Sequence, residues 1–418
     1  MSLAVRDARL DGETVGLRVE NDTISALGAG VEPVPGDEVI DAGGMALLPG
    51  LVNGHTHAAM TLMRGYGDDV PLMEWLQERI WPIEANLTGD DIYWGTRLAC
   101  IEMIRSGTVR FWDMYWHPDA VARAVNDAGL RATVALPLVD GLDADKSDAL
   151  RVEAERMLVS LPDAGGRVAS SLGPHAIYTV SEKSLRWVAE LSSERDLPVQ
   201  IHLSETEDEV RDCMKAHGVR PAPYLDRIGL LTPRTLLAHG VWLDDDELAL
   251  VGERGATIVT NPVSNLKLAV GGIFPYAKAR HEGIPVGLGT DGAASNHSLD
   301  LFQDVKHLAL MQKHAAGDPA AMPAAEAWAV ATGGRAPLLG EHGRVAAGEP
   351  ADFLLVRTDL PELTPGDLTA NLVYAASGSV VDTTVVGGQV LMRGREVDGE
   401  AEVREGVLAS ARRLGVIE

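Results

Sequence analysis

The stretch Leu48-Pro49-Gly50-Leu51-Val52-Asn53-Gly54-His55-Thr56-His57 decides the fold and points to the chemistry of this chain. Its apolar run is typical of a buried strand, and it ends in His55 and His57 with one residue between them. In an extended segment, residues i and i+2 point to the same side, so the two imidazoles converge. Neutral imidazole is the commonest metal ligand in proteins. The alternative is a polar strand end with two exposed histidines, and further ligand-type residues at later strand ends would decide against it.

Short apolar runs recur after residue 48 and alternate with longer helical patterns, which is typical of βα units around a parallel sheet. The sequence predicts eight strands, at 48–52, 109–114, 132–138, 168–172, 199–203, 235–238, 257–260 and 286–288. Eight βα units that close on themselves form an α/β TIM barrel, whose active site lies at the C-terminal ends of the strands. The insertion 58–88 follows the first strand, and its length predicts a functional loop.

Both ends of the chain predict a second, all-β unit. Residues 1–47 contain three short strand patterns with hairpin signals such as Asp11-Gly12, and residues 345–418 return to strands around a Gly387-Gly388 turn before a terminal helix. Neither end is long enough to bury much apolar surface alone, so we expect the two ends to pair. The predicted architecture is a TIM (β/α)8 barrel over residues 48–344, inserted into a small β-sandwich that both chain ends form.

Composition excludes several classes of function. The 418 residues include 61 Asp and Glu against 36 Lys and Arg, a formal net charge of −25. Such a field repels nucleic acid and anionic membranes, so neither is an expected partner. No apolar stretch is long enough to span a bilayer. Only seven of the basic residues are lysines. This acidic, lysine-poor composition is what a protein of a high-salt cytoplasm would carry, with an ordinary acidic enzyme as the alternative.

The two cysteines predict a reducing environment. Cys100 and Cys213 both fall in helical patterns, so we expect no disulfide framework. Residues 1–7 lack the charged and then apolar pattern of a signal peptide. We therefore expect a cytoplasmic protein.

Ligand-type residues do collect at the predicted strand ends. Five histidines and two acids lie within a few residues of a strand C-terminus: His55, His57, His175, His202, Glu205, His239 and Asp291. Twelve histidines scattered at random would not gather in this way, which favours a functional site. The other seven are predicted to be structural or on the surface: His117, His217, His281, His297, His307, His314 and His342.

Three histidines and one carboxylate, with an open position for water, form a catalytic site for Zn²⁺ or a similar divalent ion. A bound ion lowers the pKa of water to about 7. A second carboxylate that is not a ligand can then move protons, and Glu205 lies one helical turn from His202.

These motifs resemble the amidohydrolase superfamily in its cytosine deaminase-like and chlorohydrolase-like branch, and more closely the 5-methylthioadenosine/S-adenosylhomocysteine deaminase family. The resemblance covers nearly the whole chain. The motifs that carry it are residues 49–57, Gly173-Pro174-His175, His202-Leu203-Ser204-Glu205-Thr206, Ala238-His239-Gly240, Asn261-Pro262-Val263-Ser264-Asn265 and Gly289-Thr290-Asp291-Gly292-Ala293-Ala294-Ser295-Asn296. Gly54 stands where relatives often carry Thr, a difference that should leave metal binding unaffected.

The resemblance implies one divalent metal ion held by His55, His57, His202 and Asp291. Zn²⁺ is the expected ion, and Fe²⁺ or Mn²⁺ would also suit these ligands. No lysine stands at the end of the fourth strand, which favours one ion over two. The resemblance further implies that Asp291 takes a proton from the attacking water, Glu205 protonates N1 of adenine, and His239 polarises the nucleophile. The products would be the inosine analogue and ammonia.

The resemblance also implies substrate contacts. Glu84 matches a residue that binds the ribose hydroxyls, and a carboxylate is suited to accept both. Arg151 matches, with a shift of one residue, an arginine that pairs with a homocysteine carboxylate; a solvated helix arginine is the alternative. Trp75 would pack on the 5′ substituent, or only within the lid. The remaining predicted contacts are His175, Glu205, Asp291 and Ser295.

The predicted function is hydrolytic deamination of 5′-modified adenosines, such as 5′-methylthioadenosine, S-adenosylhomocysteine, 5′-deoxyadenosine or adenosine itself. One alternative is a deaminase or chlorohydrolase acting on another purine or aminated N-heterocycle. Glu205 weighs against dechlorination, since chloride leaves without protonation, and Glu84 favours a substrate with a ribose. The alternative of another class is a barrel scaffold without catalysis. The expected partner is a small nucleoside, and the sequence is compatible with a homo-oligomer.

Overall fold

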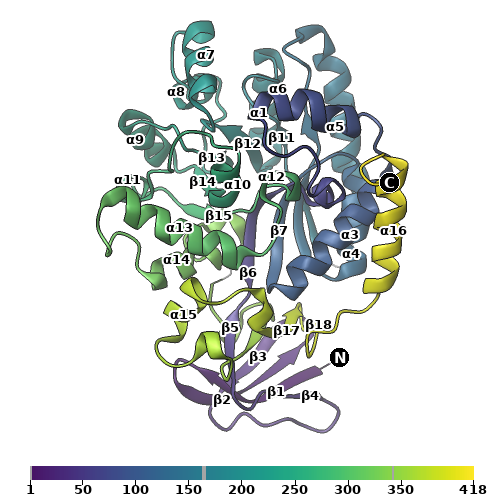
Figure 1. Ribbon diagram of the computed structural model, residues 1–418, viewed down its shortest axis with the longest axis vertical. Helices are drawn as coiled ribbons and strands as arrows, with labels where there is room; N and C mark the ends of the chain where they lie inside the picture. The colour runs from purple at the N-terminus through teal and green to yellow at the C-terminus, as the bar shows by residue number, and fades with distance from the viewer. Residues whose placement is uncertain (1, 162–165, 341–342) are drawn as a thin grey trace.

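The computed structural model describes residues 2–161, 166–340 and 343–418, and these residues form two parts (Figure 1). The larger part alternates strands and helices and fills the upper part of Figure 1. The smaller part is a sheet at the bottom, where the N-terminus lies. His342, which the sequence predicts to be structural or on the surface, lies outside the described residues.

The larger part contains the predicted parallel strands in two four-stranded sheets. The first has the order β10-β8-β7-β6, formed by Val168–Ser170, Arg131–Ala135, Thr108–Met114 and Leu51–Thr56. The second has the order β12-β13-β14-β15, formed by Val199–Leu203, Thr235–His239, Thr257–Thr260 and Val286–Leu288. Two short strands, β9 (Pro137–Leu138) and β11 (Gly173–Pro174), pair with each other beyond β8 and β10. The predicted parallel strands are therefore confirmed.

The two sheets meet along both edges, in the order that the predicted TIM barrel requires. On one side, parallel bridges join Leu172 to Val199 and Ala176 to His202. On the other side, the backbone N–H of Asp291, just after β15, donates to the carbonyl of His55 in β6 at 3.0 Å. Both junctions place residues of the predicted site at the seams between the sheets.

Gly54 faces the packed interior of this barrel. A Cβ at this position would lie 2.9 Å from the side chains of both Val259 and Leu339, closer than Cβ atoms come. Interiors at crystal-like density leave no spare room for a methyl group. The glycine that directly precedes His55 is therefore explained by close packing against Val259 of β14 and Leu339, and not by metal binding.

Helices cover the outside of the barrel (Figure 1). They are α3 (Gly89–Arg105), α4 (Pro118–Ala128), α5 (Ser147–Ser160), α6 (Glu182–Arg195), α7 (Glu207–His217), α8 (Pro221–Arg227), α9 (Asp245–Arg254), α10 (Pro262–Lys267), α11 (Tyr276–His281), α12 (Ala293–Asn296), α13 (Leu301–Ala316) and α14 (Ala324–Ala331). Several of these helices have strong caps: Thr88 and Asp244 each form a capping box, and Gly129 and Gly255 end helices in the left-handed conformation. No helix among the described residues is long and apolar enough to cross a membrane.

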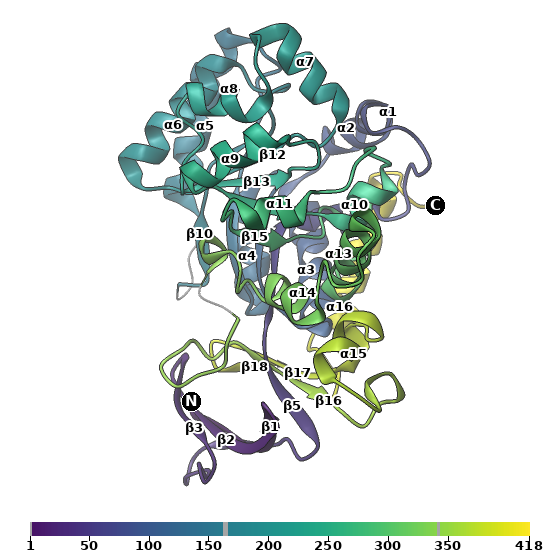
Figure 2. The same cartoon turned by 90° about the vertical axis from the view of Figure 1, so that its left-hand side faces the viewer.

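The smaller part is one hydrogen-bonded sheet of eight strands, so the predicted sandwich is a single sheet around a shared apolar core (Figure 2). Its order is β18-β17-β16-β5-β1-β2-β3, with β4 paired to β1. The strands are β1 (Ser2–Leu10), β2 (Glu13–Glu20), β3 (Thr23–Gly28), β4 (Glu38–Asp41), β5 (Met45–Pro49), β16 (Phe353–Arg357), β17 (Val381–Val386) and β18 (Gln389–Met392). Antiparallel pairing of β5 with β16 joins the two ends of the chain.

The predicted first barrel strand, 48–52, is divided between the two parts. Leu48 and Pro49 belong to β5 in the small sheet, and the barrel strand β6 begins at Leu51. Gly50 lies between them, where a Cβ would come within 2.3 Å of the Val109 side chain. The close approach of β7 at this glycine therefore marks the transition from sheet to barrel.

Three further features differ from the sequence analysis. The insertion 58–88 is largely helical, with η1 (Ala58–Met63), α1 (Leu72–Glu74), a π-helix at Trp75–Ile80 and α2 (Trp81–Glu84). Strand β4 was not predicted. The terminal helix α16 (Glu400–Arg413), grouped by prediction with the small β domain, lies instead on α3 of the barrel, where Val403 and Val407 pack against Ile101.

Candidate active site

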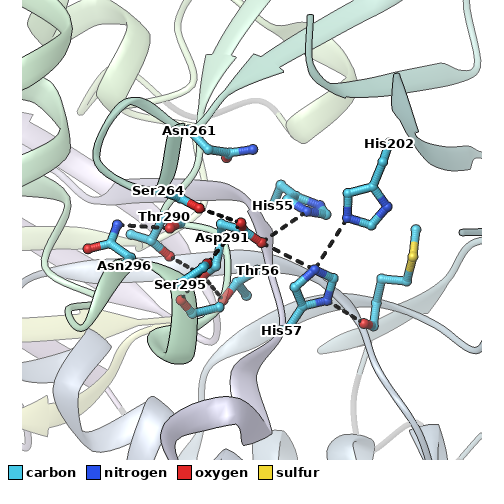
Figure 3. A network of polar contacts seen from close by, with 12 residues as sticks. His55, Thr56, His57, His202, Asn261, Ser264, Thr290, Asp291, Ser295 and Asn296 are labelled. Atoms are coloured by element: carbon cyan, nitrogen blue, oxygen red, sulfur yellow. Dashed lines mark hydrogen bonds and ion pairs between the residues drawn. The ribbon is translucent and has the colours of Figure 1, made fainter. Parts of the chain in front are cut away.

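The predicted histidines and Asp291 converge at the C-terminal ends of the barrel strands (Figure 3). His57 Nε2 lies 3.2 Å from Asp291 Oδ1, and His55 Nε2 lies 3.6 Å from the same oxygen. The Nε2 atoms of His57 and His202 are 3.3 Å apart. Strands β6 and β12 and the loop after β15 therefore bring four residues to one point.

His239 belongs to the same cluster. One ligand atom from each of four buried residues lies within 4.8 Å of the others: His55, His202, His239 and Asp291. His57 adds a fifth donor through its short distances to Asp291 and His202. Three histidines and a carboxylate suit a mononuclear divalent site, and the cluster holds one histidine more than such a site needs.

Neighbouring acceptors orient three of the imidazole rings. His57 Nδ1 lies 2.7 Å from the carbonyl of Met114, and His202 Nδ1 lies 2.7 Å from the carbonyl of His175. A carbonyl can only accept, so Nδ1 donates in both rings and Nε2 presents its lone pair to the cluster. His239 Nδ1 makes the same kind of contact, 2.8 Å from Asn265 Oδ1. These hydrogen bonds preorganise the rings as ligands.

His55 shows that the site fits a metal ion. Its ring is completely buried, and neither ring nitrogen has a hydrogen-bond partner among the described residues. A buried polar atom without a partner is rare and costly in a folded protein. A cation between His55 and Asp291 would satisfy this nitrogen, and the donor set of imidazoles and one carboxylate suits a divalent transition metal.

Burial keeps His55 and His202 neutral, as metal ligands must be. Burial, followed by the charges of neighbouring histidines, lowers the pKa of His202 well below its usual range. Burial lowers the pKa of His55 to about 4, against the opposing effect of Asp291. For His57, burial acts in the same direction, but the Asp291 carboxylate outweighs it and raises the pKa to about 9. A proton and a metal ion therefore compete for the His57–Asp291 pair.

Two serines hold the other oxygen of Asp291. Ser264 Oγ donates to Asp291 Oδ2 at 2.7 Å, and Ser295 Oγ donates to it at 3.0 Å (Figure 3). These bonds leave Oδ1 turned toward His55 and His57. Burial alone would raise the pKa of Asp291, but the close approach of His55 and His57 holds that pKa well below its usual range. Ser295, predicted as a substrate contact, does line the cavity but bonds this carboxylate.

Glu205 lies at the edge of the cluster, as the proton-transfer assignment requires. Its Oε1 is 3.8 Å from Nδ1 of His239, and its side chain lines the cavity in front of the metal ligands. Burial raises the pKa of Glu205, against the opposing effect of His239. A carboxyl group with a raised pKa can hold a proton near neutral pH and give it to a substrate.

The cluster opens into one large cavity of about 950 Å³. Its wall includes Trp75 and Glu84 from the insertion 58–88 and His175 from the end of the fourth predicted strand. Pockets of this size are typical of small-molecule sites, and this one exceeds the bulk of a nucleoside alone. The space beyond the nucleoside is available for a substituent.

Glu84 is connected to the ligand cluster through two consecutive residues, Met114 at the end of β7 and Tyr115 directly after it. The Tyr115 hydroxyl donates to Glu84 Oε1 at 2.8 Å, while the preceding residue, Met114, accepts from His57. Burial raises the pKa of Glu84, opposed by the Tyr115 hydrogen bond. The end of β7 thus fixes the position of a cavity carboxylate relative to the ligand cluster.

The structure places Arg151 outside the cavity. Its guanidinium lies over the Trp187 ring, 5.5 Å from the centroid. The arginine of α5 that lines the cavity is Arg156, on the side of the helix that also carries Glu153 and Met157. His117, predicted to be structural or on the surface, lines the cavity as well.

Three buried residues at the strand ends have left-handed backbone. Ser204, His239 and Asp291 have φ angles of 51°, 77° and 61°. Only glycine adopts this conformation without strain, although Asp and His tolerate it better than Ser. Such residues cluster where the surrounding structure holds a functional group in place. Here each one belongs to the cluster or directly precedes Glu205.

Several polar residues around the cluster were not identified from the sequence as functional. They are Tyr115, Ser264, Asn265 and Glu209, which hydrogen-bond Glu84, Asp291, His239 and the backbone of Glu205, respectively. Ser264 and Asn265 stand within a quoted motif, so the motif itself was a signal. Tyr115 and Glu209 carried none beyond their nearness to strand ends.

Comparison with known proteins agrees with this geometry. Residues 46–391 match the model of the amidohydrolase family. The chain is 48% identical to the 5′-deoxyadenosine deaminase of Methanoregula boonei, covering 94% of this chain and 90% of that protein. It is 42% identical to 5-methylthioadenosine/S-adenosylhomocysteine deaminase 1 of Archaeoglobus fulgidus, over 95% and 94% of the two chains. The structure of an adenosine deaminase from Xanthomonas campestris with bound zinc superimposes with a TM-score of 0.91 at 32% identity, covering 100% and 98%.

Proposed function

The chain belongs to the amidohydrolase family and is a hydrolase of the deaminase type, and from this premise we propose that it removes the 6-amino group of 5′-modified adenosines. The observation that carries the proposal is one cavity that contains both the ligand cluster with Glu205 and, on its wall, Glu84. A metal site alone would suit many hydrolases. Glu84 adds a carboxylate that can accept two sugar hydroxyls.

We assign a single divalent ion, with Zn²⁺ as the proposed metal, to His55, His57, His202 and Asp291. This ion supplies Lewis acidity and lowers the pKa of water toward neutrality. The buried, unpartnered nitrogens of His55 and the oriented Nε2 atoms of His57 and His202 support this ligand set.

The other cluster residues have proton-transfer roles in the proposal. Asp291 takes a proton from the water that attacks C6, because its carboxylate remains ionised in the buried site. Glu205 gives a proton to N1 of the purine, for which its raised pKa prepares it. His239, held by Asn265, polarises the nucleophile. Asp291 then passes its proton to the amino group, and the C6–N bond breaks with release of ammonia. The remaining hydroxyl proton at C6 is lost as the carbonyl of the inosine analogue forms, which restores the proton of Glu205.

Substrate contacts follow the walls of the cavity. Glu84 is proposed to accept the ribose hydroxyls, with Tyr115 holding its other side. His175 and Trp75 line the same space and are assigned to the nucleoside and its 5′ substituent. For a carboxylate-bearing substituent such as homocysteine, we propose Arg156 in place of Arg151, because Arg156 faces the cavity.

The remaining expectations concern the protein's surroundings. Cys100 and Cys213 are both free and buried, which supports a reducing compartment, and we propose the cytoplasm. A homo-oligomer remains a proposal. The scaffold alternative is set aside because the ligand cluster is complete and the similar curated proteins are deaminases.

The test is an assay of ammonia release by the zinc-loaded protein with 5′-deoxyadenosine, 5′-methylthioadenosine, S-adenosylhomocysteine and adenosine. Free adenine and guanine, assayed in the same way, and a chlorotriazine, assayed for chloride release, serve as comparison substrates. We expect one ammonia per inosine analogue formed from the nucleosides, and little turnover of the comparison compounds. Turnover of guanine or the triazine, with none of the nucleosides, would reject the proposal. Glu205→Gln is the matched inactive control, since it removes the proton donor but preserves the side-chain shape.

A further inference from the structure

The segment between β12 and α7 makes an unusual turn just where it carries Glu205. Ser204 has a left-handed backbone with φ of 51°, and its side-chain oxygen is buried with no hydrogen-bond partner in the described part of the chain. The backbone N–H of Trp242 donates to the Ser204 carbonyl at 2.9 Å. The next residue, Glu205, projects into the cavity beside His239. The position of Glu205 therefore depends on a turn that serine does not favour by itself.

Glu209 holds this turn with both of its carboxylate oxygens. Its Oε1 accepts from the N–H of Ser204 at 2.9 Å, and its Oε2 accepts from the N–H of Glu205 at 2.9 Å. The Glu209 side chain is buried beside them. Hydrogen bonds from backbone N–H groups to a carboxylate are shorter and stronger than neutral ones. Two of them on consecutive N–H groups leave the turn little freedom.

This arrangement is a departure from ordinary helix capping. In α3 and α9, the third helical residue returns to the N–H of the cap residue: Asp91 to Thr88, and Glu247 to Asp244. In α7 the cap is Thr206, and its hydroxyl accepts from the Glu209 N–H. The Glu209 carboxylate, however, passes the cap and bonds the two residues that precede it. Capping alone does not account for this choice of partners.

We propose that Glu209 is a positioning residue that fixes the Ser204–Glu205 turn and so aims the Glu205 carboxyl at the substrate. The proposal rests on the proposed function, in which Glu205 protonates the purine. Glu209 does not line the cavity, and it acts through the backbone of Ser204 and Glu205. Loss of its two hydrogen bonds would allow Ser204 to leave the left-handed region and would displace the proton donor.

The decisive variant is Glu209→Asp. It keeps a carboxyl group at the helix N-terminus, and α3 uses Asp91 in the same position of its own capping box, so a role in capping alone predicts wild-type activity. The shorter side chain cannot reach both N–H groups. We expect kcat for 5′-deoxyadenosine to fall about 100-fold, with KM and bound metal within about twofold of wild type. Glu207→Asp, an exposed residue in the same first turn, is the matched control and should leave kcat unchanged.

A double-mutant cycle separates positioning from general destabilisation. If Glu209 acts through Glu205, then Glu209→Asp should lower the residual activity of Glu205→Gln by less than about threefold, because the group that it positions is already gone. An equal fold-loss in both backgrounds, or an unchanged kcat for Glu209→Asp, would overturn the proposal. Loss of metal in proportion to kcat would also overturn it.

A crystal structure of zinc-loaded Glu209→Asp keeps this inference separate from the proposed function. If the wild-type protein releases no ammonia from any nucleoside, the proposed function fails. The structure would still show whether the turn at Ser204 depends on Glu209. A rearranged Ser204 backbone with a displaced Glu205 supports the dependence. An unchanged turn contradicts it.

Discussion

The mouth of the barrel and the small sheet at its base both contain left-handed backbone, but for different reasons. Both contain residues other than glycine with positive φ. In the first two strands of the sheet and the turns beside them, these are exposed Asp and Asn residues: Asp7, Asp11 and Asn21. At the mouth they are the buried residues Ser204, His239 and Asp291. Turn chemistry explains the first set, whereas the second set persists because hydrogen bonds around the site hold it.

The same contrast appears in what each region buries. The sheet buries side chains such as Leu17 and Phe353, packed into one apolar cluster. The mouth buries His55, which has no hydrogen-bond partner among the described residues. It also buries two carboxyl groups, Glu205 and Asp291, and the negative charge of Asp291 acts on Glu205. The sheet therefore contributes stability, while the mouth holds strained and desolvated groups that are useful only for binding and chemistry.

The largest expected effect is loss of metal binding and activity at the mouth of the barrel, with the sheet at its base still folded. His202→Ala removes a proposed ligand, so bound metal should be lost and kcat/KM should fall by at least about 1,000-fold. Metal content by mass spectrometry and ammonia release measure the two effects. The free energy of unfolding of the metal-free protein should change little. Full zinc occupancy in His202→Ala would remove His202 from the ligand set.

A core substitution in the sheet should lower stability and leave the activity of the folded protein unchanged. Phe353 is fully buried in β16, and Phe353→Ala is expected to lower the free energy of unfolding by about 3–5 kcal/mol. The kcat per folded molecule should stay within about twofold of wild type, because the sheet contributes no side chain to the cavity. Urea denaturation and active-site titration check the pair of values. A large fall in kcat at full folding would show that the two regions are coupled.

Within the mouth, Glu84→Ala sharpens the division between metal chemistry and sugar recognition. We expect KM for 5′-deoxyadenosine to rise about 10- to 100-fold, because hydrogen bonds to a charged group are lost, while bound metal is unchanged. Any slow turnover of free adenine should be nearly unaffected. Equal effects on nucleoside and base would exclude Glu84 from the ribose site.

The smallest expected effect is on the pH dependence of the free energy of unfolding. None of the twelve histidines lies in residues 1–47 or 345–418, so histidine protonation acts only on the residues between them. Burial, with the charges of neighbouring histidines, lowers the pKa of His175 to about 3. The pKa of His175 in the unfolded chain is about 6.5. Between this pH and about pH 3, His175 binds a proton in the unfolded chain but not in the folded protein, so the free energy of unfolding falls as pH falls.

His175→Asn should therefore flatten the pH dependence of stability. From pH 7 to 5.5 the wild-type protein should lose about 1–1.5 kcal/mol more than the variant. Chemical denaturation of the metal-free protein at the two pH values provides the measurement. Parallel losses in wild type and variant would mean that His175 is protonated in the folded state.

The sequence predicted the regular parts of both regions because alternation and βα spacing are local signals. Strands 199–203, 257–260 and 286–288 have the predicted bounds. Strand β4 was not predicted because only one of its four residues is buried, so its sequence shows no clear alternation of apolar and polar residues. The boundary at Gly50 escaped because it depends on contact with Val109 from another strand.

The candidate site was predictable where chemistry is carried by residue type, and unpredictable where it depends on helix orientation. The ligand residues stand in motifs next to strand ends. Arg151 and Arg156 lie on one helix, and only packing of Arg151 on Trp187 decides which of them faces the cavity. Glu209 resembles an ordinary capping residue until its partners are seen. Such choices are tertiary, and no local pattern encodes them.

The most direct test of the account is anomalous diffraction at the zinc edge from crystals of the zinc-loaded protein. The account predicts one strong peak per chain at the barrel mouth, about 2.0–2.2 Å from Nε2 of His55, His57 and His202 and from one oxygen of Asp291. A peak bound elsewhere, or no peak in protein that releases ammonia from 5′-deoxyadenosine, would contradict it.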